Sequence, residues 1–267
     1  GSMSKLSSGE RIRNAGDDPA GLAMSERLRA QARNSAAAAS NIENEISYIQ
    51  TADSWLQKVH DILGRMTELS IAANDGTKDE TDLGNLQEEF SQMQQEVQRI
   101  TDGSTSAAKY NGKAMLQGNE RTIQVGPDFG QEFTLSSINL TSGDATSIGT
   151  AGDGSTAVTW GSLIDDDELS IGTQSAAGTA VAKLNLGIDY ISQKRAVVGA
   201  QRSRLNHTLE GLRNYEDNIR GAESQIRDVD VAKETTEFSK NQILTQIGTA
   251  MLAQANQLPQ GVMQLVG

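Results

Sequence analysis

An apolar residue recurs at every seventh position between residues 184 and 226 of this chain. A heptad repeat held over this length keeps one side of a helix apolar and is typical of long, coiled-coil-like helices. The intermediate positions mix Ile188 and Leu209 with charged residues, which argues against a simple two-stranded seam. We therefore predict one long helix over residues 173–227, packed into a bundle. The repeat consists of Leu184, Ile191, Val198, Leu205, Leu212, Ile219 and Ile226.

Two earlier segments carry apolar residues at steps of three or four, which predicts two further helices. We expect the first to end at Asn74-Asp75-Gly76, with Gly76 as its C-cap, and the second to stop at Asp102-Gly103-Ser104. A short connection would make the two antiparallel. The first stripe is Ile42, Ile46, Ile49, Ala52, Leu56, Val59, Leu63, Met66, Leu69 and Ala73, and the second is Leu83, Leu86, Phe90, Met93, Val97 and Ile100.

The remaining segments complete a mostly α fold. Asp18 and Pro19 predict the start of a short helix that runs to about Ala32. Tyr110-Asn111-Gly112 predicts a tight turn. Short β-like runs on either side of residues 126–130 predict a hairpin, and residues 141–161, rich in Gly, Ser and Thr, predict a loop.

We thus predict an elongated antiparallel helical bundle or coiled-coil rod, with a small β-hairpin element in the middle and an amphipathic helical segment at the C-terminus. We divide the chain into five segments: 4–35, a linker with a short helix; 36–118, the first rod helices; 119–172, a variable hairpin and loop region; 173–227, the long rod helix; and 228–267, the C-terminal segment.

From Ser239 onward, the C-terminal segment has an apolar helical face opposite a side that carries mainly Gln, Asn and Thr. A solvated helix usually carries Lys and Glu there, so this helix is expected to be covered on more than one side. The candidate contact residues are Ile243, Leu244, Ile247, Ala250, Met251, Leu258, Val262 and Leu265.

No enzyme, cofactor or metal site is expected. The two histidines, His60 and His207, lie far apart, and neither a zinc-protease motif nor a phosphate-binding loop occurs. The acidic run Asp165–Glu168 fits no calcium loop and is read as a solvated turn. Trp55 is expected to pack beside the helical core, whereas Trp160 has no assigned role.

Composition limits the partners. The net charge of −12 makes nucleic acid an unsuitable partner, because binding phosphates needs a basic patch. No apolar run reaches the ~18 residues of a membrane span, so membrane insertion is not expected. The chain has no cysteine and no cleavable signal peptide, so if the protein leaves the cell we expect it to use a route other than signal-peptide secretion.

Long motifs at both ends resemble bacterial flagellin. They are SKLSSGERIRNAGDDPAGLAMSERLR from Ser4, ESQIRDVD from Glu223 and NQILTQIGTAMLAQANQLPQ from Asn241, and the resemblance covers roughly residues 4–118 and 173–267. Gly1-Ser2-Met3 is typical of a cloning remnant, so we expect an N-terminally truncated form that lacks a preceding helix. The resemblance implies a structural subunit that self-assembles into the extracellular flagellar filament after type III export.

The resemblance also implies partners besides other subunits. A flagellin-specific export chaperone would hold residues 228–267 in the cytoplasm before secretion. Toll-like receptor 5 would bind the rod through Arg65, Glu68, Leu69 and Glu89, although Gly64, Thr67 and Met93 depart from the family pattern. Two alternatives remain open at this point: a hook–filament junction protein, and a coiled-coil binding module unrelated to motility.

Overall fold

The computed structural model describes residues 2–102, 106–150, 157–165 and 169–266, and side chains as far as Ala255. Two compact units can be distinguished within it. The terminal unit comprises residues 1–36 and 213–267, and the central unit comprises residues 37–212. The division of the chain into five segments stays a prediction.

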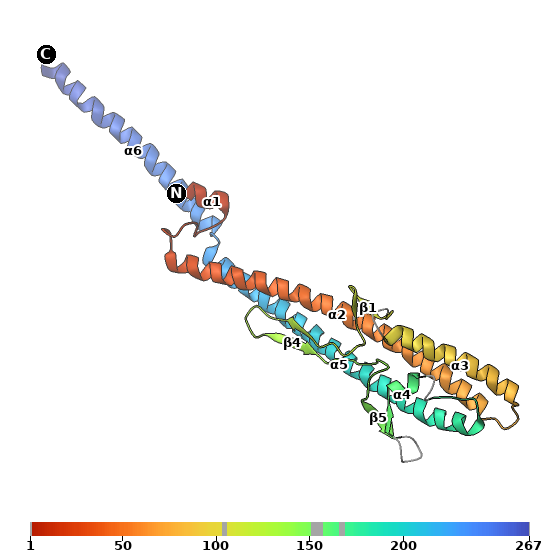
Figure 1. Ribbon diagram of the computed structural model, residues 1–267. Helices are drawn as coiled ribbons and strands as arrows, with labels where there is room; N and C mark the ends of the chain where they lie inside the picture. The colour runs from red at the N-terminus through yellow and green to blue at the C-terminus, as the bar shows by residue number, and fades with distance from the viewer. Residues whose placement is uncertain (1, 103–105, 151–156, 166–168, 267) are drawn as a thin grey trace. The chain divides into compact units, whose positions relative to one another are not determined.

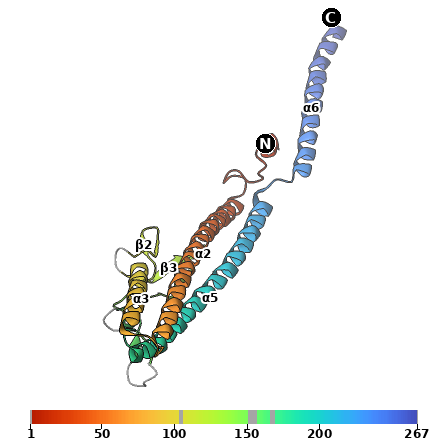
Figure 2. The same cartoon turned by 90° about the vertical axis from the view of Figure 1, so that its right-hand side faces the viewer.

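Three helices lie side by side in the central unit, as both views show (Figures 1 and 2). They belong to α2 (Pro19–Ala73), α3 (Glu80–Thr101) and α5 (Gln174–Arg227). The predicted stripe of α2 is buried except for half-buried Ile46, and the α5 repeat is buried from Leu184 to Leu212. The mostly helical fold predicted from periodicity is confirmed.

The start of α2 is capped as predicted, but its extent is not. Asp18 Oδ1 accepts a hydrogen bond from the Gly21 amide at 2.9 Å, which satisfies one of the free amides of the first turn. The short helix expected to end near Ala32 instead continues without a break to Ala73. The connecting residues 33–41 contain four alanines, the best helix formers, and no glycine or proline.

The end of α2 is turned by a side chain rather than by a glycine. Gly76 does not have a positive φ, so the predicted glycine C-cap is wrong. Asp75 accepts hydrogen bonds from the Thr77 amide at 3.1 Å and the Thr77 hydroxyl at 2.9 Å. These bonds lower the pKa of Asp75. The next helix starts with a capping box in which the Asp82 amide donates to Asp79 at 2.8 Å.

Two hairpins confirm the β predictions. The first joins β1 (Lys109–Tyr110) to β2 (Lys113–Ala114), and its turn residues Asn111 and Gly112 have φ values of 49° and 74°. The second pairs β3 (Arg121–Gln124) with β4 (Glu132–Leu135) in a continuous antiparallel register.

A third hairpin occupies the region predicted to be loop. It pairs β5 (Ser147–Thr150) with β6 (Ala157–Thr159) and is followed by the short helix α4 (Gly161–Ile164). Burial explains the error, because Val158 and Trp160 are anchored in the core and Leu186 of α5 packs tightly against Gly149. The predicted solvated turn at Asp166, Asp167 and Glu168 lies outside the described residues.

Buried amide side chains hold this irregular segment against α3. Gln94 Nε2 lies 3.2–3.4 Å from the carbonyl oxygens of Leu163, Asp165 and Leu169. Trp160, whose role was open, is fully buried and donates from its indole nitrogen to the Leu140 carbonyl at 2.7 Å. Trp55 is partly buried against the core, as expected.

The terminal unit contains the two ends of the chain. It holds α1 (Ser2–Ser8), the beginning of α2, the end of α5 and α6 (Val231–Val266). Within this unit α1 contacts α6.

We predict that Leu63→Ala lowers the free energy of unfolding by about 2–5 kcal/mol, because it leaves a cavity in a fully buried site. Ile71→Ala on the same helix is the matched control, since Ile71 is 60% exposed and its truncation should change stability by less than about 0.5 kcal/mol. Urea unfolding followed by circular dichroism measures both. Equal losses for the two variants would contradict the assignment of this core.

Candidate interaction surfaces

The apolar residues of α6 are exposed. The helix begins at an Asp230 cap, whose carboxylate accepts from the Lys233 amide at 3.1 Å. The predicted contact residues Ile243, Leu244, Ile247 and Met251 are 54–65% exposed, and Ala250 is exposed as well. Leu258, Val262 and Leu265 belong to the same helix, but their side chains lie outside the described part of the chain.

Sequence reasoning missed two exposed large apolar residues on this helix, Val231 at its start and Leu252 further along. Leu252 is 66% exposed and lies about 180° around the helix from Ile243 at roughly 100° per residue. The signal for it was present, because the sequence contains no charged residue after Lys240. A helical stretch without charge and with apolar residues on two sides can be covered by more than one partner element.

Sequence reasoning also missed a clamp in the terminal unit. A β-bridge joins Glu10 to Asp228, with the Arg11 amide 2.6 Å from the Arg227 carbonyl oxygen and the Val229 amide 2.9 Å from that of Gly9. The Arg227 guanidinium pairs with Glu10 at 3.0 Å and with Glu26 at 2.8 Å, and its side chain is only 12% exposed. The clamp therefore fastens the segment before α2 to the connection between α5 and α6.

The electrostatics of the clamp follow from this pairing. Hydrogen bonding to Glu26 raises the pKa of Arg227, and the same bond lowers the pKa of Glu26. A lowered carboxylate pKa adds stability above the pKa of the unfolded chain, and that stability is lost as the pH falls through the folded-state value. The clamp should therefore weaken only in acid.

Three of the four predicted receptor residues form one exposed cluster. Arg65 on α2 pairs with Glu68 at 3.0 Å and with Glu89 on α3 at 2.7 Å, and hydrogen bonding to Glu89 raises the pKa of Arg65. Leu69 lies in the core beneath them, at 3% exposure. The surface part of the predicted patch is therefore charged, with one arginine held between two carboxylates.

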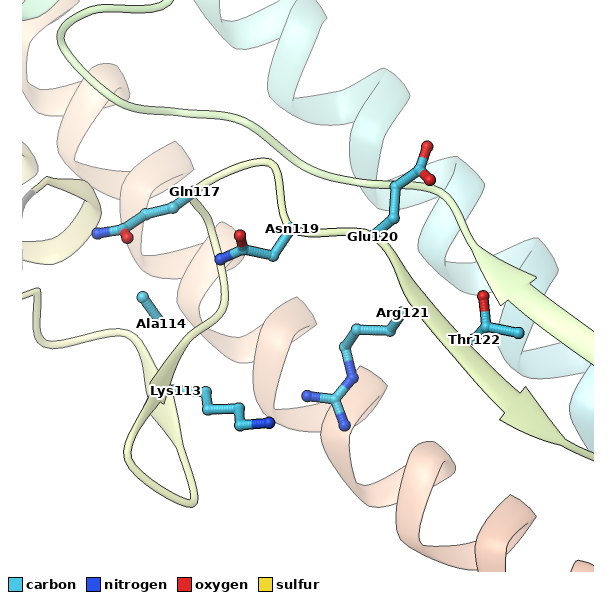
Figure 3. Close-up of a pocket in the computed structure, with 7 residues that line it drawn as sticks. All are labelled: Lys113, Ala114, Gln117, Asn119, Glu120, Arg121 and Thr122. Carbon is cyan, nitrogen blue, oxygen red and sulfur yellow. The ribbon is translucent and has the colours of Figure 1, made fainter.

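A pocket lies between the first two hairpins, and Figure 3 shows the side chains of Lys113 and Arg121 approaching one another inside it. Arg121 is already engaged, because its guanidinium lies 3.6 Å from the Glu45 carboxylate and 4.2 Å from the centre of the Tyr48 ring. Tyr48 in turn packs edge-on against Tyr110, with ring centres 5.5 Å apart. This arrangement anchors the hairpins to α2.

Glu45 is the one strongly buried carboxylate of this anchor, at 3% exposure. Burial raises its pKa, and the neighbouring Arg121 offsets the effect only in part. One of its oxygens has no hydrogen-bond partner among the described residues. The ionised form is therefore disfavoured in the folded protein.

The described residues contain no group of three or more His, Cys, Asp and Glu side chains placed to hold a metal ion. His207 is exposed and His60 is half-buried. Within the same part of the chain, none of the helices combines the length and apolar character needed to cross a membrane.

Comparison with known proteins gives matches at both ends of the chain. Residues 1–121 match the bacterial flagellin N-terminal helical region, and residues 181–266 match the bacterial flagellin C-terminal helical region. The chain is 41% identical to a flagellin of Halalkalibacterium halodurans over 266 residues, which covers 99% of this chain and 90% of that protein. It is also 41% identical to flagellin of Bacillus subtilis, with 99% and 91% covered. The flagellar filament 33 kDa core protein of Treponema phagedenis is 40% identical, with 99% and 91% covered.

Solved structures agree with this comparison. A crystal structure of Bacillus cereus flagellin matches with a TM-score of 0.50 and 26% identity, covering 65% of this chain and 88% of that one. A protein of Vibrio parahaemolyticus assigned as flagellar hook-associated has the same fold, with a TM-score of 0.59 at 15% identity, covering 79% and 100%.

We predict that Arg227→Ala speeds hydrogen exchange of the Arg11 and Val229 amides by roughly tenfold or more, because the β-bridge loses its side-chain support. Arg220→Ala is the matched control, since Arg220 is an exposed arginine of the same helix that pairs only with Glu216 among the described residues. Exchange measured by mass spectrometry or NMR tests this. Unchanged protection of both amides in Arg227→Ala would contradict a supporting role for the guanidinium.

We also predict that Glu45→Gln raises the melting temperature at pH 7 and has little effect near pH 4. A carboxyl whose folded pKa is raised binds its proton more tightly in the folded state, so its contribution to stability falls as the pH rises above the unfolded value. Thermal unfolding at the two pH values measures the difference. A larger gain at pH 4 than at pH 7 would reverse the sign and refute the argument.

Proposed function

This chain belongs to the bacterial flagellin family and is a structural subunit of the flagellar filament, and from this premise we propose how its C-terminal helix serves assembly. One observation carries the proposal: α6 exposes apolar residues along a stretch without charge. Apolar surface of this kind gains free energy when a partner covers it. In the filament, the partners are the corresponding segments of neighbouring subunits.

The proposed filament contacts are Ile243, Leu244, Ile247, Ala250, Met251, Leu258, Val262 and Leu265. Subunits that meet through unlike surfaces form an open array rather than a closed ring. The family assignment, with relatives named as filament core proteins, favours this function over a hook–filament junction protein or an unrelated binding module. The protein is proposed to act without catalysis, as expected of a structural protein family.

The same helix would need protection before assembly. We propose that a flagellin-specific export chaperone covers residues 228–267 in the cytoplasm and is released when the subunit is secreted. The same exposed apolar residues support this step, because an uncovered surface of this kind favours premature association. The filament then assembles outside the cell.

A second candidate partner is supported by the charged cluster on α2 and α3. We propose that Arg65, Glu68 and Glu89 contact Toll-like receptor 5, with buried Leu69 fixing the position of the helix beneath them. The carboxylates hold the guanidinium in place, so little side-chain freedom remains to be lost on binding.

We predict that Ile247→Asp prevents assembly and abolishes chaperone binding, because it places a charge in the apolar surface that both partners cover. Lys240→Gln is the matched control, since it makes the same change of one negative unit at a position already charged. Sedimentation measures assembly, and calorimetry with the chaperone measures binding. If Ile247→Asp assembles and binds as well as Lys240→Gln, the proposed role of α6 is wrong.

We predict that Arg65→Ala weakens binding to the receptor ectodomain by about tenfold, the effect typical of losing one well-placed charged contact. Arg99→Ala serves as the control, because Arg99 is an exposed arginine on α3 paired with Glu96 in the same manner. Surface plasmon resonance measures both variants. An equal effect of the two substitutions would show that only overall charge matters.

A further inference from the structure

The tip of the β3–β4 hairpin presents a bare aromatic ring. Phe129 is 102% exposed, more than any other large apolar side chain among the described residues. Aromatic side chains bury more area than most others and dominate contacts between proteins. This ring therefore has a large gain available from a partner and receives none from its own chain.

The loop that carries Phe129 is held rigid. Gln124 Nε2 donates to the carbonyl oxygens of Gly126 at 2.9 Å and Asp128 at 2.5 Å, while Gln131 Oε1 accepts from the Asp128 amide at 3.2 Å. Gly130 follows the ring with a φ of 83°, which favours glycine. Because the loop is already ordered, little conformational entropy is lost when the ring is buried.

A groove of matching size lies between α2 and α5. It is lined by Ile49, Asp53, Arg195, Val198, Gly199 and Arg202 and holds about 170 Å³. An engineered apolar cavity of roughly 150 Å³ in a protein binds benzene, so this groove, in which three of the six lining residues are charged, has the volume for a phenyl ring. Gly199 adds no side chain to the lining of the groove, and no atom lies within 4 Å of the place where one would begin.

The charges around the ring and around the groove are complementary. Exposed Asp128 and Glu132 flank the ring, and neither forms an ion pair within the described part of the chain. In the groove, Asp53 is paired with Arg195 at 2.9 Å, which leaves exposed Arg202 as a further positive group. A negative tip approaching this groove is therefore attracted and oriented.

The hairpin and the groove lie on opposite sides of the same helix pair. Beneath the hairpin, Leu135 shares a small cavity with Gln201, which lies to one side of buried Val198 on α5. The groove uses Arg195, Gly199 and Arg202, which lie to the other side of Val198 at about 100° per residue. A chain can thus offer its hairpin to one copy and its groove to another, which is the geometry of an open helical array.

We propose that Phe129 of one subunit inserts into the groove around Gly199 of a second copy, with Asp128 facing Arg202. The inference extends the filament function and rests on it for the identity of the partner. It assigns an assembly contact to the central unit, separate from the contacts proposed for α6.

The contact can be tested by cross-linking, because the chain contains no cysteine. Asp128→Cys, which keeps Phe129 and Glu132, is mixed with Ser203→Cys, an exposed position next to Arg202 that keeps the arginine, and treated with a short bismaleimide. We expect the mixed dimer to form roughly tenfold faster than in a control in which Gly84→Cys, at an exposed position on α3, replaces the cysteine next to the groove. Docking raises the effective concentration of the two thiols only in the first mixture. Adding Phe129→Ala to the Asp128→Cys chain should remove the difference.

The reaction is read separately in sedimented filaments and in the supernatant. Filaments without preferential cross-linking would overturn this contact and leave the filament function standing. Preferential cross-linking without filaments would support the contact while counting against assembly by this chain. Equal rates in both fractions, or a preference that survives Phe129→Ala, would also overturn the proposal.

Discussion

The central unit depends on the burial of one apolar ridge. The α5 residues at seven-residue spacing from Leu184 to Leu212 are buried, and they belong to the same apolar core as the α2 stripe from Ile42 to Ala73. Each fully buried aliphatic side chain contributes about 1.5–3 kcal/mol relative to exposure, so this ridge outweighs any single polar contact in the unit. The hairpins, by contrast, are too short to be stable alone and persist because they pack on these helices.

Polar contacts decide where the irregular segments lie on this helical base. Gln94 binds three backbone carbonyls of the segment that includes α4, and Arg121 joins the second hairpin to Glu45 and Tyr48 on α2. Buried hydrogen bonds of this type contribute little net stability, but leaving such groups unpaired would be costly. They fix where these segments lie on the helices. The raised pKa of Glu45 shows that this placement has an electrostatic cost.

The spacing of apolar residues was sufficient to predict the helices. It could not predict the contacts between residues that lie far apart in the sequence. The stripes of α2, α3 and α5 repeat at helical spacing, so their buried faces could be read directly, and the Asn111-Gly112 turn followed from the tolerance of these residues for positive φ. The third hairpin was missed because Val158 and Trp160 are isolated apolar residues in a polar stretch, and only tertiary burial stabilises their strand. The Arg227 clamp pairs residues more than 200 positions apart, which no local pattern reveals.

The two kinds of exposed apolar surface reflect different physical solutions to assembly. On α6 after Lys240 the surface is long, uncharged and two-sided, so its association depends on area and is not strongly directional. On the β3–β4 tip, a single ring is fixed by hydrogen bonds and flanked by carboxylates, so its association depends on shape and charge. A subunit that must join many identical neighbours needs both properties. Extended apolar contact supplies free energy, whereas a rigid, charged contact distinguishes the correct register from nearby alternatives that bury almost the same area.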